Sequence, residues 1–191
     1  MSKQKVQLIR IVFGAVLAAM VFVVTMFRCP LLGSKVHFAN AVCLLSGLLL
    51  GPVWGGFAAG MGSMLYDLFL YNEGIINLLI TFVSKFAMAW VAAVLFRAFM
   101  KKYRDSSAKE TILPLVISCV IGALTYVALY MVKSAIYGAS AGNAWAAVAS
   151  KFPASIINAA VATIAAPIFY GAVLPALKSG RILQELEAAK G

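Results

Sequence analysis

The sequence predicts an all-α integral membrane protein with six transmembrane helices and cytoplasmic N- and C-termini. Hydrophobic residues make up 63% of its 191 residues and charged residues 12%, whereas soluble domains carry about 25% charged residues. The apolar residues form long blocks without the period-two alternation of a membrane β-barrel. The basic residues lie beside these blocks, so we attribute the net charge of +10 to membrane topology rather than to nucleic-acid binding.

The first predicted helix covers residues 6–26 and opens a single six-helix domain over residues 1–191. Lys3, Lys5 and Arg10 precede its apolar run, as in a secretory signal. No small-residue cleavage site follows the run, so we expect this helix to be retained in the membrane.

The second and third helices are predicted over residues 38–50 and 53–71, on either side of a Gly51-Pro52 turn. A spanning helix needs about 20 apolar residues, so the second helix is short and must rely on its neighbours. This region is rich in glycine, which is favoured where membrane helices pack backbone to backbone.

The last three helices are predicted over residues 75–99, 111–137 and 153–177. Pro153 suits the first position of a helix, and residues 138–151 before it are interpreted as a loop of small residues. The remaining segments are predicted to be a turn, a polar loop and an amphipathic tail, at residues 72–74, 100–110 and 178–191.

The basic residues predict the orientation of the helices. With six spans, both termini and the loop between the fourth and fifth helices lie on one side of the membrane. This side carries eleven basic residues, and five lie elsewhere. By the positive-inside rule, the side with eleven faces the cytoplasm.

Lys85 is a charged residue about 15 Å deep in the fourth helix, at about 1.5 Å per residue. A charge at that depth costs about 3 kcal/mol, so Lys85 must face the bundle interior, a wet cavity or a partner. Asp67, near the outer end of the third helix, is a candidate partner. Two interpretations stay open: a structural ion pair between the third and fourth helices, or contact of one or both residues with a ligand.

The outer half of the fifth helix carries an aromatic face with a cation at its centre. Tyr126, Tyr130, Lys133 and Tyr137 follow at spacings of four, three and four residues and so share one face. This face suits a flat heterocycle with polar or anionic substituents. The alternative is an interfacial aromatic belt with a snorkelling lysine.

Polar residues in the outer halves of other helices indicate a cavity that opens outward. Singly, Asn40, Asn77 and Asn158 would each indicate an interhelical hydrogen bond. Together with the charged and aromatic residues they indicate one substrate site, capped by the loop at residues 27–37. The candidate substrate-binding residues are Asn40, Asp67, Asn77, Lys85, Tyr126, Tyr130, Lys133 and Asn158.

The first helix carries small residues four apart. Ala15 and Ala19 form one such pair, and Gly14 and Ala18 form another. This spacing makes a smooth face on which another helix can pack. The face either docks a partner or packs within the same protein.

No motif indicates an enzyme, a metal site or a cofactor. The single histidine, His37, lies in a predicted loop, and the sequence has no HExxH or GxSxG motif. The three cysteines lack metal or redox spacing. Two of them, Cys43 and Cys119, lie within apolar runs and are interpreted as packing residues.

With these features, the chain resembles the substrate-binding S components of energy-coupling factor (ECF) vitamin transporters, in the family named after riboflavin. Its length, six helices, cytoplasmic N-terminus and small-residue face on the first helix are similar to that family's architecture. The more specific match lies in the second and third helices, with weaker similarity in the sixth. The matching residues are Asn40-Ala41, Gly47, Gly51-Pro52, Gly55, Ala59, Gly62-Ser63 and Asp67, then Asn158 and Pro167.

The resemblance implies a high-affinity capture component in a bacterial plasma membrane. It would bind a B-vitamin or precursor on the outer face, dock on a transmembrane T component that sits on two ABC ATPases, and topple to release the substrate inside. In that family an alanine motif on the first helix forms the docking surface. Ala15 and Ala19 match it, with Gly14 and Ala18 as an alternative register. The chain lacks a phosphate loop of the GxxxxGKS or GxxxxGKT type, so the partners would hydrolyse ATP.

The resemblance also implies a vitamin site built from the 27–37 loop and the outer parts of the fourth to sixth helices. The excess of basic residues on the outer side favours a neutral or anionic ligand over a cationic one such as thiamine. Riboflavin, pyridoxine-type rings, hydroxymethylpyrimidine and pantothenate remain open.

A stand-alone secondary transporter or small channel for a small polar solute is the alternative. Such a protein usually shows an inverted repeat, and none is evident between residues 1–96 and 97–191.

Overall fold

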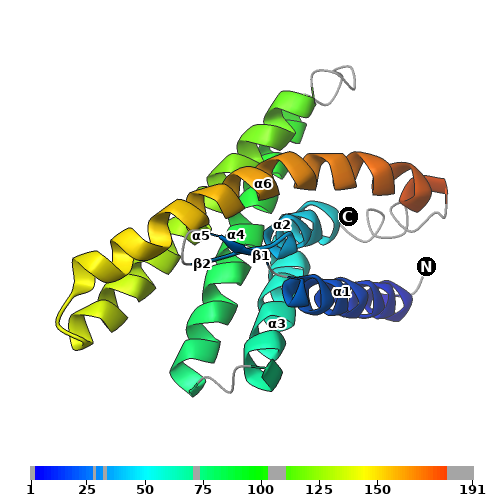
Figure 1. Ribbon diagram of the computed structural model, residues 1–191. Coiled ribbons are helices and arrows are strands. Elements are labelled where there is room, and N and C mark those ends of the chain that lie inside the picture. The colour runs from blue at the N-terminus through cyan, green and yellow to red at the C-terminus, as the bar shows by residue number, and fades with distance from the viewer. Residues whose placement is uncertain (1–2, 28, 32–33, 71–73, 103–110, 180–191) are drawn as a thin grey trace.

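The computed structural model describes residues 3–27, 29–31, 34–70, 74–102 and 111–179. These residues form six helices and one two-stranded hairpin (Figure 1). In chain order the elements are α1 (Lys3–Met26), β1 (Cys29–Leu31), β2 (Ser34–Val36), α2 (Ala39–Leu50), α3 (Pro52–Leu70), α4 (Ile75–Lys102), α5 (Ile112–Ser140) and α6 (Ala144–Ser179).

The prediction of six helices is confirmed. Four of the described helices are long and apolar enough to cross a membrane, namely α1, α4, α5 and α6, and α2 is a shorter apolar helix. The predicted turn at residues 72–74, most of the predicted loop at 100–110 and nearly all of the predicted tail lie outside the described residues.

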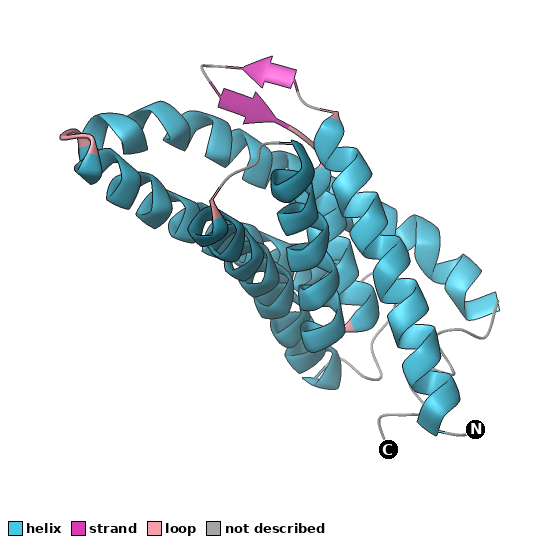
Figure 2. Cartoon of the chain, turned by 90° about the horizontal axis from the view of Figure 1, so that it is seen from below, coloured by secondary structure: helices cyan, strands magenta, loops and turns pink. Residues whose placement is uncertain are grey.

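The expectation of a purely helical chain missed the β1–β2 hairpin. Its strands pair in antiparallel register, with Pro30 opposite Lys35 (Figure 2). Each strand has three residues, which is too short for an alternating pattern to be recognised in a sequence.

Helix α2 lies at the centre of the bundle, and all twelve of its residues are buried. It packs against each of the other five helices. A helix that is apolar all round is expected to be enclosed in this way. The hydroxyl of Ser46 donates to the backbone carbonyls of Cys43 at 2.7 Å and of Gly55 at 2.8 Å, which satisfies this buried polar group.

Two glycines permit the close contact between α2 and α3 and the tight turn that joins them. At Gly55, an added Cβ would lie 2.3 Å from the carbonyl oxygen of Ser46, so only glycine permits this approach. Gly51, between the helices, has a φ of +85°, a conformation that favours glycine. Pro52 is the first residue of α3, a position that suits proline, so the helix begins one residue before the predicted start at residue 53.

Helix α6 begins at Ala144, nine residues before the predicted start at Pro153. The turn before it contains Gly142, whose φ is +81°. The side-chain oxygen of Asn143 accepts a hydrogen bond from the N–H of Ala146 at 3.0 Å and caps the helix. Pro153 therefore lies inside the helix, a position that membrane helices tolerate better than soluble ones.

Helices α5 and α6 form a long hairpin that extends beyond the ends of its neighbours, as the yellow segments of Figure 1 show. The two helices approach closely near the turn, where a Cβ added to Gly138 would lie 2.5 Å from the Cβ of Ala147. The tip is apolar and exposed, and Trp145 is 85% exposed.

Candidate ligand site and the groove between α1 and α3

A buried lysine joins α4 to α2 and α5. The ammonium of Lys85 donates a hydrogen bond to Oδ1 of Asn40 and lies 3.8 Å from the centroid of the Tyr126 ring. Only 5% of Lys85 and 1% of Asn40 is exposed. A cation over an aromatic face is stabilised by the ring quadrupole, more strongly when water is excluded.

The sequence placed these three residues in one candidate site, and the structure brings them into contact. Because Lys85 and Asn40 are 45 residues apart, no local pattern indicates that they pair. The described contacts of Lys85 do not include Asp67, which is half-buried on α3. Lys85 has further interactions beyond these two contacts, and the ion pair between Asp67 and Lys85 stays a prediction.

The tyrosines predicted on α5 divide into two groups. The rings of Tyr126 and Tyr130 are stacked, with centroids 5.8 Å apart and an interplanar angle of 17°. Lys133 is half-buried one turn further along, and Tyr137 is exposed. Tyr126 and Tyr130 thus belong with Lys85 and Asn40 to one group of contacting side chains, which we call the Lys85 cluster. Tyr137 lies instead near the exposed tip of the α5–α6 hairpin.

Asn158 connects α6 to the hairpin. Its side-chain oxygen accepts a hydrogen bond from the backbone N–H of His37 at 2.9 Å, and β2 packs against α6. Asn40 follows three residues after His37, so the hairpin is held beside the start of α2. The sequence identified Asn158 but gave no sign that its partner is a backbone group.

One further polar contact lies near Lys85. Cys43, one turn after Asn40 on α2, places its Sγ 3.8 Å from the Oγ of Ser63 on α3. Cys43 and Cys119 are buried free thiols, in agreement with their interpretation as packing residues.

Asn77, the remaining asparagine of the predicted site, is half-buried in the first turn of α4. It is not one of the residues in contact with Lys85 that are named above.

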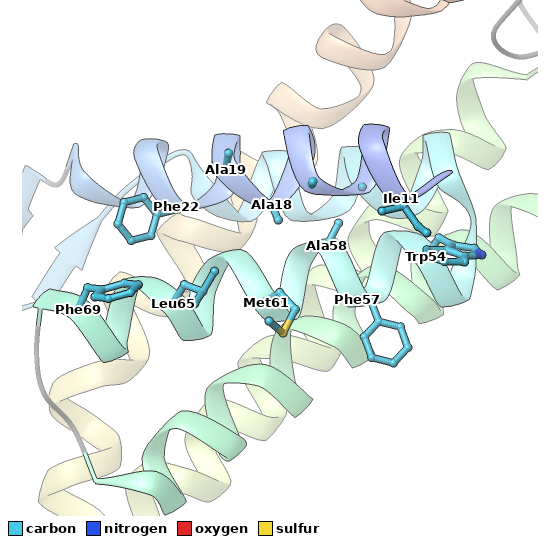
Figure 3. Close-up of a pocket in the computed structure, with 12 residues that line it drawn as sticks. Ile11, Ala18, Ala19, Phe22, Trp54, Phe57, Ala58, Met61, Leu65 and Phe69 are labelled. Carbon is cyan, nitrogen blue, oxygen red and sulfur yellow. The ribbon is translucent and has the colours of Figure 1, made fainter. Parts of the chain in front are cut away.

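An apolar groove of about 540 Å³ runs between α1 and α3 (Figure 3). All four small residues predicted as a docking face line it: Gly14, Ala15, Ala18 and Ala19. Aromatic and aliphatic side chains from both helices complete the lining, among them Phe22, Trp54, Phe57 and Met61.

The two small-residue registers on α1 have different environments. A Cβ added to Gly62 of α3 would lie 2.3 Å from the carbonyl oxygen of Ala18, so Ala18 faces a close helix–helix contact. Ala15 and Ala19 are exposed. Ala18 thus borders α3, and Gly14 lies against Leu50 of α2, whereas Ala15 and Ala19 present a surface to the outside of the bundle.

Among the residues that the structure describes, no group of three or more His, Cys, Asp or Glu side chains is placed to hold a metal ion. The groups around Lys85 are a cation, the amide of Asn40 and the rings of Tyr126 and Tyr130, which are groups suited to binding a small ligand.

Comparison with known proteins agrees with this architecture. Residues 5–174 match the family model described as "ECF-type riboflavin transporter, S component". A solved structure described as the S component of a bacterial ECF transporter superposes with a TM-score of 0.67 at 19% sequence identity, covering 90% of this chain and 99% of that one. None of the curated proteins compared matches the chain.

Proposed function

The chain belongs to the ECF-type riboflavin transporter S component family, and from this premise we propose that it captures a B-vitamin or a vitamin precursor at the outer face of a bacterial cell membrane. The family consists of transporter components that bind substrate, and not of enzymes. The candidate ligands are riboflavin or a related flavin, a pyridoxine- or hydroxymethylpyrimidine-type ring, and pantothenate.

The observation that carries the proposal is the contact of Lys85 with Asn40 and Tyr126. Ionisable residues inside a membrane bundle are costly and tend to mark substrate pathways. Three helices converge on this one ammonium, next to the hairpin that precedes α2. A polar, partly aromatic site of this kind suits a small ring with a few hydrogen-bonding groups.

The other candidate residues take supporting roles in this proposal. Tyr130 extends the aromatic wall from Tyr126, and Asn158 fixes the hairpin over the site. Lys133, Asp67 and Asn77 are half-buried and would form the rim.

We further propose that the groove between α1 and α3 receives a helix of a transmembrane T component. Its lining is apolar, and its small residues allow close backbone approach. The T component would rest on two ABC ATPases, which supply the energy of uptake.

The proposed topology has six membrane crossings with both termini in the cytoplasm. The start of α1 and the end of α6 lie toward the same side of the bundle (Figure 1), and the basic residues are most numerous on that side. Helices α2 and α3 would complete the six, α2 being too short to cross alone.

The direct test is to purify the full chain in mild detergent, denature it and identify any released small molecule by absorbance and mass spectrometry. A near-stoichiometric vitamin supports the proposal. Protein that releases none, and whose melting temperature no vitamin raises, contradicts it. Lys85→Met, which keeps the aliphatic stem, should retain far less ligand, whereas Lys101→Met on the exposed end of α4 should retain as much as the wild type.

Purification from native membranes separates an importer component from a stand-alone transporter. An S component should bring down a T component and two ATPases. A solitary chain that nevertheless supports uptake in liposomes would favour the stand-alone transporter.

A further inference from the structure

We propose that the tip of the α5–α6 hairpin, residues 136–152, anchors the protein in the headgroup layer of one membrane leaflet. This is the leaflet opposite the termini, which is the outer one in the proposed topology. The partner of the tip is the lipid surface, with aromatic rings at the boundary between headgroups and acyl chains and Lys151 beside the lipid phosphates. The tip is separate from the vitamin site and from the groove between α1 and α3.

An exposed apolar ridge runs along α6 toward the tip. From residue 152 to residue 168 every fourth residue is exposed and apolar: Phe152, Ile156, Ala160, Ile164 and Ile168. Residues four apart are neighbours on a helix surface, so the ridge is continuous. Trp145 lies seven residues before Phe152, about two turns along the same face. The surface that α6 presents to the lipid therefore continues from the body of the helix to the tip.

The aromatic residues of the tip are of the kind found where membrane meets water. Trp145 on α6 and Tyr137 on α5 are both exposed, and they lie only eight residues apart around the turn. Tryptophan and tyrosine are enriched at the headgroup level, because the ring is apolar and its N–H or O–H can reach water. Two such rings at one end of a hairpin predict a defined depth for that end.

The hairpin extends beyond the ends of its neighbours (Figure 1), and its tip can still lie among the headgroups. Hydrophobic helices that are longer than the hydrocarbon layer is thick tilt in the bilayer. A tilted hairpin keeps its apolar ridge in contact with acyl chains, whereas an upright one would raise the ridge and Trp145 into water.

The charge of the hairpin suits a phosphate. Residues 112–179 include no aspartate or glutamate. Lys151 is half-buried on α6, six residues or about 9 Å along the helix from Trp145. A lysine at this level places its aliphatic stem along the apolar surface and directs its ammonium toward the headgroups. The turn at the very end carries small polar residues, among them Ser140 and Asn143, which suit the hydrated part of that layer.

The depth of Trp145 tests the proposal directly. The chain has three tryptophans, Trp54, Trp90 and Trp145, so Trp54→Phe with Trp90→Phe leaves Trp145 alone. The full chain would be reconstituted into phosphatidylcholine vesicles with bromine at a shallow or a deep position of the acyl chains, where it quenches nearby tryptophan. We expect shallow bromine to quench Trp145 at least about twofold more than deep bromine.

Trp90 provides the matched control, because it is exposed near the middle of α4. As the only tryptophan, in Trp54→Phe with Trp145→Phe, it should be quenched more by deep bromine. If Trp145 is quenched by acrylamide in the water and by neither brominated lipid, the tip lies in water and the inference is overturned. Quenching of Trp145 that is equal at both depths, or stronger for deep bromine, would overturn it as well.

Lys151→Met tests the cation separately, because it keeps an unbranched stem and removes the charge. In the chain with Trp145 alone, this change should let the tip sink and lower the ratio of shallow to deep quenching by about 1.5-fold or more. Lys101→Met at the other side of the membrane should leave the ratio unchanged. A ratio that is also unchanged in Lys151→Met would remove Lys151 from the anchor.

Discussion

Oδ1 of Asn158 accepts a 2.9 Å hydrogen bond from the backbone N–H of His37, a residue 121 positions earlier in the chain. This bond ties the β1–β2 hairpin to α6. It is made by a buried side chain, so its loss leaves a backbone donor without this acceptor.

Asn158→Ala should lower stability by about 1–3 kcal/mol and speed ligand dissociation, because the hairpin loses its attachment to α6. Thermal unfolding and a stopped-flow dissociation experiment measure the two effects. His37→Ala is the matched control, since it keeps the N–H that donates the bond. If His37→Ala releases ligand as fast as Asn158→Ala, the imidazole and not the backbone bond holds the hairpin.

Tryptophan at Ala15 or Ala19 should abolish vitamin uptake and leave Kd unchanged. The two positions are exposed in the α1–α3 groove, where an indole would fill the space proposed for a partner helix. Uptake in reconstituted vesicles and calorimetry on the isolated chain measure the two properties. Val16→Trp provides the comparison, because Val16 is exposed on α1 but does not line the groove. Equal loss of uptake in Val16→Trp would argue against the groove as the docking surface.

Gly55→Ala should destabilise the bundle by about 1–3 kcal/mol through overpacking. The new methyl group would meet backbone atoms of Ser46 and Gly47 at 2.3–2.5 Å. Gly171→Ala on α6, where no atom lies within 4 Å, should instead be neutral or stabilise by up to about 1 kcal/mol. Thermal unfolding of both variants in the same detergent makes the comparison, and similar melting temperatures would contradict the close contact between α2 and α3.

Asn143→Ala should cost about 1 kcal/mol, because the first turn of α6 loses the oxygen that caps it. Asn143→Ser should restore most of the loss, as serine is also a good cap. The effect should appear in hydrogen exchange as faster exchange at Ala146 and its neighbours. Protection that is unaltered in Asn143→Ala would show that the cap contributes nothing to the start of the helix.

The parts of the fold that sequence reasoning predicts well are those specified locally. The turn at Gly51-Pro52 needs only two adjacent residues, and the stacking of Tyr126 on Tyr130 follows from a spacing of four on one helix. The start of α6 was also specified locally, by Gly142 and Asn143, but Pro153 gave a stronger and misleading signal.

The features that sequence reasoning missed depend on tertiary packing. Nothing near Lys85 in the sequence identifies Asn40 as a partner; their contact follows from the enclosure of α2 among the other helices. Likewise, the hydrogen bond between His37 and Asn158 uses a backbone group, which every residue except proline possesses. Such pairings become visible only when the helices are placed in space.

The length of α6 has a mechanical consequence. Its 36 residues extend for about 54 Å at about 1.5 Å per residue, while the hydrocarbon layer of a bilayer is about 30 Å thick. Along its contour α6 is therefore longer than a single crossing of the hydrocarbon layer requires. If the protein rotates as a rigid body about an axis near α2, the hairpin tip at Trp145 is displaced further than the buried residues near that axis.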